Sequence, residues 1–252
     1  MFKAMMCFVI TILTLLLSAE LCFSAQACVA VLNSADLSAE QLENVKIDTQ
    51  SISSFFSDLA LTYDVPIGLE VAANDNQSAR YYVEFKKGPL AEFLTQFVTE
   101  HTQYTWQIVD GVVNVFPKDG YRDPLSQDLL AVKLGKFAVR ENTSCWNFIA
   151  SLLDRPEMKT ILEANDTTYS RRSPSGFYIP QLGRKFTLEV SDLMVGSILN
   201  KVIGGSPTAK FWVIKRNSDR TLFLHVSAHH EDSLKTRGKR PLQELLGEDP
   251  RQ

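Results

Sequence analysis

Cysteine and histidine are scarce in this chain, with four residues of each among 252. Cys7 and Cys22 lie within the first 27 residues, so removal of that segment would leave only Cys28 and Cys145. Two cysteines define no disulfide framework, although one Cys28–Cys145 disulfide is a candidate in an oxidising compartment. A disulfide-rich scaffold is therefore not expected.

An excess of charge of either sign is also absent, since 26 Lys and Arg residues face 29 Asp and Glu residues, for a net charge of −3. This slightly acidic balance argues against broad nucleic-acid binding, which requires a basic face. A composition of 45% hydrophobic and 22% charged residues is typical of a globular protein and excludes a wholly disordered chain. The length suggests about two domains of ~100–150 residues each.

Long apolar runs are missing after the N-terminus, so no transmembrane segment is expected in the mature chain. A signal peptide is predicted over residues 1–27. It has a positive start at Lys3, the apolar segment CFVITILTLLL (7–17) and a small-residue cleavage site at 25–27. A membrane anchor is the competing interpretation, but the apolar run is short for a span of ~20 residues. The expected location is periplasmic or secreted, and the alternative is a lipoprotein anchored through Cys28.

The common signatures of catalysis are absent as well. The sequence has no G-x-S-x-G, H-E-x-x-H, P-loop or dinucleotide fingerprint, so we expect no enzymatic activity and no cofactor. The segment HVSAHHED (225–232) combines imidazoles with carboxylates and could hold zinc or copper. Its simpler interpretation is a strand that runs into a solvated tail, and we predict no metal site. His101 is expected at the C-terminal end of a helix.

What the chain does have is a repeated pattern of apolar residues. Four segments place apolar residues at i, i+3, i+4, i+7 and i+8 or close to it, which predicts amphipathic helices. These segments are 51–63, 89–101, 142–154 and 192–205. The first and third are offset by 93 residues and the second and fourth by 105. Cys145 matches the core position of Ile52, so a buried side chain is expected there, although a thiol near a helix start could also serve as a nucleophile.

Strands repeat at the same offsets. Period-two alternation over 81–85 recurs at 186–190, and IGLEV (67–71) matches TILEA (160–164). The hairpin YTWQIV-DG-VVNVF (104–116) corresponds to 209–226. We predict an α+β fold of two tandem βαββαββ modules, each with two helices packed between a two-stranded and a three-stranded sheet.

The predicted boundaries follow from composition. The first module spans 36–118 and the second 129–228, separated by the turn-rich link PKDGYRDPLSQD (117–128). The second module carries an insertion at 165–185. Residues 229–252 are polar and charged, and we expect a flexible tail.

The first module resembles the secretin and TonB short N-terminal domain. The resemblance is carried by SSFFSDLALTYDVPIGLEV (53–71) and VEFKKGPLAEFLTQFVTEHTQYTWQIVDGVVNVF (83–116). It extends over 45–116, and more loosely over 137–226. Such domains lie at the periplasmic end of secretins and TonB-dependent receptors, so the resemblance implies a sandwich of two helices between small sheets and a protein partner in the cell envelope.

These observations lead to one functional expectation and one alternative. We expect a protein–protein interaction or scaffold module in an envelope assembly (secretion, pilus or outer membrane) that acts by strand pairing or helix docking. The candidate partner is an envelope protein such as a secretin or another outer-membrane component. The alternative is a module for a small ligand, glycan or metal that uses the basic-aromatic insertion or the histidine cluster. The candidate partner-binding residues are Trp106, Val113 and Val115 in the first hairpin and Arg171, Arg172, Phe177 and Tyr178 in the insertion.

Overall fold

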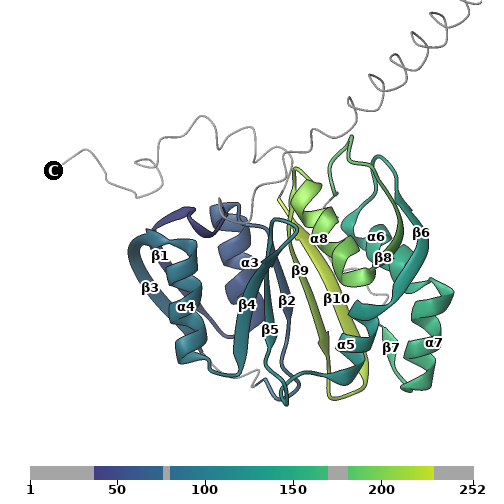
Figure 1. Ribbon diagram of the computed structural model, residues 1–252, viewed down its shortest axis with the longest axis horizontal. Helices are drawn as coiled ribbons and strands as arrows, with labels where there is room; N and C mark the ends of the chain where they lie inside the picture. Colours follow the sequence, from purple (N-terminus) through teal and green to yellow (C-terminus); the bar gives the residue numbers. More distant parts are fainter. Residues whose placement is uncertain (1–36, 76–79, 170–180, 230–252) are drawn as a thin grey trace, which may run out of the picture. The chain divides into compact units, whose positions relative to one another are not determined.

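The computed structural model describes residues 37–75, 80–169 and 181–229, which all belong to the same structural unit. The described residues have the predicted mixed α+β class (Figure 1). The predicted signal peptide and residues 230–252 of the predicted tail lie outside them. No helix in the described part of the chain is long and apolar enough to cross a membrane.

The first half has both helices predicted from the apolar spacing. Its elements are β1 (Gln41–Thr49), α3 (Ile52–Tyr63), β2 (Ile67–Glu70), β3 (Tyr81–Pro89), α4 (Leu90–Glu100), β4 (Tyr104–Val109) and β5 (Val112–Pro117). Helix α3 begins after Ser51, whose Oγ accepts a hydrogen bond from the Ser54 backbone N–H at 3.1 Å. The expected apolar face is buried, with Phe55 and Phe93 from the two helices both fully inaccessible.

The second half also has its two predicted helices, together with two that were not predicted. Its elements are α5 (Pro124–Ala131), β6 (Lys133–Val139), α6 (Cys145–Leu153), α7 (Pro156–Ala164), β7 (Thr168–Tyr169), β8 (Leu188–Met194), α8 (Val195–Gly205), β9 (Ala209–Arg216) and β10 (Thr221–Ala228). The expectation of a strand at 160–164 is wrong, because this segment is the end of α7. Pro156 occupies the first turn of that helix, and Met158 and Leu162 bury one helical face.

The strands form two separate two-stranded sheets and one six-stranded sheet. The small sheets pair β1 with β3 and β6 with β8, both antiparallel. The large sheet has the order β4-β5-β2-β9-β10-β7. The predicted three-stranded sheets are therefore not separate, because β2 pairs in parallel with β9 and joins the strands of the two halves.

Each half contributes three strands to this sheet in the same order. In β4-β5-β2 an antiparallel pair is followed by a parallel one, and β9-β10-β7 repeats that arrangement. Phe148 and Ile198 of the second half are fully buried, like Phe55 and Phe93 of the first. The correspondence is consistent with an internal duplication, which itself stays a prediction.

Two hydrophobic cores lie on opposite faces of the six-stranded sheet. Along β9, Phe211 and Val213 belong to the core with α3 and α4, whereas Trp212 and Ile214 belong to the core with α6 and α8. Successive side chains of a strand point to opposite faces, so the two sets of helices cover the sheet from opposite sides. Figure 1 shows α3 and α4 on one side of β2 and β9 and α8 on the other.

The joint between β2 and β9 depends on a glycine. Gly68 is the register partner of Trp212, and a Cβ atom at Gly68 would lie 2.3 Å from Cε2 of the indole. The indole is fixed there because its Nε1–H donates to Oδ1 of buried Asn200 at 2.9 Å. A residue with a side chain at position 68 would therefore force these two central strands or the tryptophan to move.

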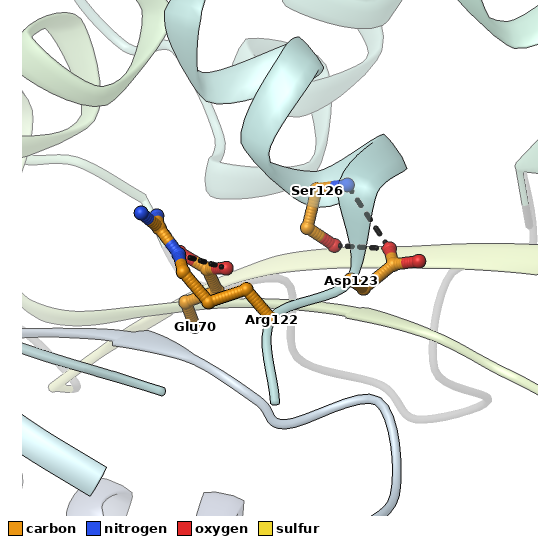
Figure 2. A network of polar contacts seen from close by, with 4 residues as sticks. All are labelled: Glu70, Arg122, Asp123 and Ser126. Carbon is orange, nitrogen blue, oxygen red and sulfur yellow. Dashed lines mark hydrogen bonds and ion pairs between the residues drawn. The ribbon is translucent and has the colours of Figure 1, made fainter. Parts of the chain in front are cut away.

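The predicted link between modules is packed against the sheet. Its Arg122 makes a two-pronged ion pair with Glu70, which lies at the end of β2 and is 2% exposed (Figure 2). The next residue, Asp123, caps α5 by accepting hydrogen bonds from the backbone N–H and the hydroxyl of Ser126, at 3.0 and 2.8 Å. The arginine also lies over the ring of Phe116, 5.6 Å from its centroid. These contacts fasten the start of α5 to the strands of the first half.

Candidate functional site

Strand β4 is one border of the six-stranded sheet, and a tight turn sets its register with β5. Asp110 and Gly111 have φ angles of 55° and 71°, which are required for a two-residue turn with both central residues left-handed. Val109 and Val112 close this turn and exchange hydrogen bonds. The register of every other residue along β4 follows from that pair.

In this register, the backbone N–H and C=O groups of Trp106 and Ile108 point away from β5, towards the open side of β4. In an antiparallel pair, hydrogen-bonded and non-hydrogen-bonded positions alternate, and both residues occupy non-hydrogen-bonded positions opposite β5. The alternation agrees with two neighbouring bonds, from Lys118 N–H to the Gln103 carbonyl at 2.8 Å and from Val113 N–H to the Pro66 carbonyl. Within the described residues, no other strand pairs with this side of β4.

The composition of β4 distinguishes it from the open edges of the two small sheets. YTWQIV contains no charged residue, no proline and no glycine. Among the described strands, β1, β3, β6 and β8 each leave one edge open, and each carries at least two charged side chains. Charged side chains and very short strands are the devices by which proteins prevent edge pairing. At the other border of the six-stranded sheet, β7 has only two residues and covers only Thr221 and Leu222 of β10.

The start of β4 is firmly held. Tyr104 is fully buried, and its hydroxyl accepts a hydrogen bond from the Ala72 backbone N–H at 3.0 Å and lies 3.3 Å from Oδ1 of Asp75. Burial is the main cause that raises the pKa of Tyr104, so the phenol stays neutral. These contacts hold the first residue of β4 in place, two residues before Trp106.

A cavity of about 290 Å³ lies near the C-terminal end of β2, separate from the open edge. Its polar lining combines Lys215 and Arg216 with Asp75 and Asp123, and Ser51 at the start of α3 adds a hydroxyl. The two acidic residues offset the two basic ones. The cavity is therefore not a strongly basic pocket.

The predicted partner-binding residues have different positions in the structure. Trp106 is half-buried on the open strand, but Val113 and Val115 are fully buried on β5, which is paired on both sides, so they are core residues rather than contacts for a partner. The other predicted contacts, Arg171, Arg172, Phe177 and Tyr178, lie outside the described residues. Sequence analysis missed Ile108, whose apolar side chain on an uncharged strand was the available signal.

The cysteine and histidine candidates have structural environments. Cys145 is a free thiol, 3% exposed, and burial raises its pKa to about 12, which is unfavourable for a nucleophile. Its proposed disulfide partner, Cys28, lies outside the described residues. His101 caps the C-terminus of α4, as expected. No group of three metal-ligating side chains occurs in residues 37–75, 80–169 and 181–229, and His230 is not among them.

Comparisons with family models, with curated proteins and with solved structures found no match to this chain.

Proposed function

We propose that this chain is a non-enzymatic interaction or scaffold module of a cell-envelope assembly, located in the periplasm, that binds a protein partner by strand addition to β4. The observation that carries the proposal is the uncharged outer edge of that strand, which pairs with no other strand among the described residues. The resemblance to the secretin and TonB short N-terminal domain and the N-terminal signal sequence favour the same compartment and class of partner. The absence of catalytic motifs from the sequence favours a binding role.

Strand addition would use groups that are already oriented. Trp106 and Ile108 each offer one N–H and one C=O to an incoming strand, and a typical intramolecular hydrogen bond contributes about 1 kcal/mol net. Alternate side chains of the incoming strand would lie beside the half-buried faces of these two residues, which would provide the apolar part of the interface. Because β4 itself carries no charge, a neutral extended segment fits this edge better than a charged one.

A photo-cross-linking experiment tests this function. A photoreactive amino acid replaces Gln107, which is exposed at the centre of β4, in the full chain produced in its own cells. The matched control places the same group at Gln96, which is exposed on α4. We expect a discrete protein adduct from position 107 in the periplasmic fraction and none from position 96. Equal labelling from both positions, or none from either, would contradict the proposal.

The cavity beside β2 favours the alternative function of binding a small anionic ligand or glycan. Lys215 and Arg216 are the residues that would hold an acidic group. Calorimetry with acidic oligosaccharides tests this function, and Lys215→Gln should abolish any saturable heat. We place it second because Asp75 and Asp123 line the same cavity and would repel the ligand.

A further inference from the structure

We infer that the strand that binds β4 is β4 of a second copy of this chain, so that two six-stranded sheets join antiparallel across a two-fold axis. This inference rests on the proposed function, because it names the partner of the same open edge. It commits to a symmetric dimer with one register, which cysteine cross-linking can resolve.

The backbone of β4 is complementary to itself in one register. If Gln107 faces Gln107 of the second copy, then Trp106 lies opposite Ile108 of the second copy, and the reverse pair forms by symmetry. Both members of each pair direct their N–H and C=O groups outward. Each pair then exchanges two hydrogen bonds, for roughly four across the junction.

The side chains of β4 suit the same register. Trp106 and Ile108 lie on the face that packs against the first core, and both keep some exposed surface. Across the axis, the indole of one copy would cover the isoleucine of the other, which is a favourable type of cross-strand pair. Gln107 points to the opposite face, and its amide can both donate to and accept from the amide of its symmetry mate. No like charges would meet at the axis, because β4 has none.

Within the described residues, the other border of the sheet is formed by β7 and by the part of β10 that β7 does not cover, Phe223 to Ala228. Strand β2 is already paired on both sides, with β5 and β9. A head-to-tail assembly would place β4 of one copy on this different edge of the next, where β7 and β10 would present an irregular border. A two-fold contact uses the same patch on both copies and closes the assembly at a dimer.

Disulfide trapping tests the register. In a non-hydrogen-bonded antiparallel pair the Cα atoms are about 4.5 Å apart, which suits a disulfide, so Gln107→Cys should form a covalent dimer under mild oxidation. Thr105→Cys is the matched control on the same face, because its partner in this register is Val109 of the second copy. The Cα atoms of the two copies of residue 105 would be about 14 Å apart, beyond the reach of a disulfide. The double variant Thr105→Cys/Val109→Cys should cross-link again.

These variants are made in the full chain with Cys7, Cys22 and Cys28 changed to serine, while buried Cys145 is kept. Dimerisation of Gln107→Cys and of the double variant, but not of Thr105→Cys, is the expected result. Cross-linking of Thr105→Cys alone as fast as Gln107→Cys would overturn the register, and no cross-linking of any variant would overturn the dimer.

Sedimentation equilibrium provides an independent measurement. The unmodified chain should be a dimer at about 100 µM, a concentration that detects even micromolar affinities. Gln107→Lys places two positive charges at the axis and should give a monomer, whereas Gln96→Lys makes the same change on α4 and should leave the dimer intact. A monomer for the unmodified chain would overturn the inference.

The photo-cross-linking experiment separates this inference from the proposed function. An adduct between position 107 and a second copy of the chain supports both. An adduct with a different envelope protein keeps the proposed function and overturns the self-pairing. Absence of any adduct contradicts both.

Discussion

Replacement of Gly68 by alanine should destabilise the fold strongly, because it adds a methyl group where two central strands meet. The new Cβ would lie 2.3 Å from Cε2, 2.4 Å from Cζ2 and 2.5 Å from Nε1 of Trp212. These atoms belong to a rigid indole that is 3% exposed and hydrogen-bonded to Asn200. The strain cannot be relieved by rotation of a flexible chain end, so the ring or the strand must shift.

The magnitude follows from two contributions. Overpacking of a close-packed core costs about 1–3 kcal/mol. If the indole moves, the buried amide of Asn200 loses its partner, which adds about 1–3 kcal/mol. We expect Gly68→Ala to lower the free energy of unfolding by about 3 kcal/mol, which corresponds to a fall in Tm of roughly 6–12 °C for a chain of this size.

Urea unfolding followed by far-ultraviolet circular dichroism measures this effect. Gly135→Ala in β6 is the matched control, because a Cβ there meets nothing within 4 Å. It should leave the free energy of unfolding unchanged or raise it by up to about 1 kcal/mol. Trp212→Phe removes Nε1 and Cζ2, so Gly68→Ala should cost less in that background than alone. Equal stability of Gly68→Ala and Gly135→Ala would refute the reasoning.

Three further predictions concern single side chains. Arg122→Ala should lower the free energy of unfolding in urea by about 3–5 kcal/mol, because it leaves the carboxylate of Glu70 buried and unpaired. Loss of the exposed ion pair between Arg220 and Asp166 should cost only roughly 0–1 kcal/mol. Because burial raises the pKa of Cys145 to about 12, iodoacetamide at pH 8 should modify this residue in urea but not in the folded chain, as mass spectrometry would show. Burial lowers the pKa of His225 below its usual 6.5, so the unfolded chain binds the proton first as the pH falls. The free energy of unfolding should therefore decrease as the pH falls from neutral towards the pKa of folded His225. Urea unfolding across this pH range should show a weaker pH dependence of that free energy for His225→Gln.

Periodicity predicted the elements whose apolar residues lie on one face. The four helices at 51–63, 89–101, 142–154 and 192–205 were found because each buries one face against a sheet. Helix α7 was mistaken for a strand because the match of 160–164 to 67–71 outweighed the helical spacing of Met158 and Leu162. A proline at the first helical position was the signal that should have decided the assignment.

The joining of the two halves was harder to predict from sequence. Strand β9 contains the continuous apolar run Phe211 to Ile214, and all four residues are buried. Such a run is typical of a strand covered on both faces, unlike the alternation in β3. That signal could have indicated that β9 lies between two cores. It could not have identified β2 as its neighbour, because this pairing depends on the fit of Gly68 to Trp212 across more than 140 residues.

The same pairing explains why β4, unlike β9, has no strand on its outer edge among the described residues. Strands β4 and β9 hold the same place in their halves, each as the first strand of the hairpin that follows the last helix. The outer edge of β9 is occupied by β2, whereas the corresponding edge of β4 has no strand beside it in the described residues. One edge of this kind therefore accepts a strand within the chain itself. The corresponding edge of β4 is uncharged, so a strand from outside the fold could pair with it and extend the sheet.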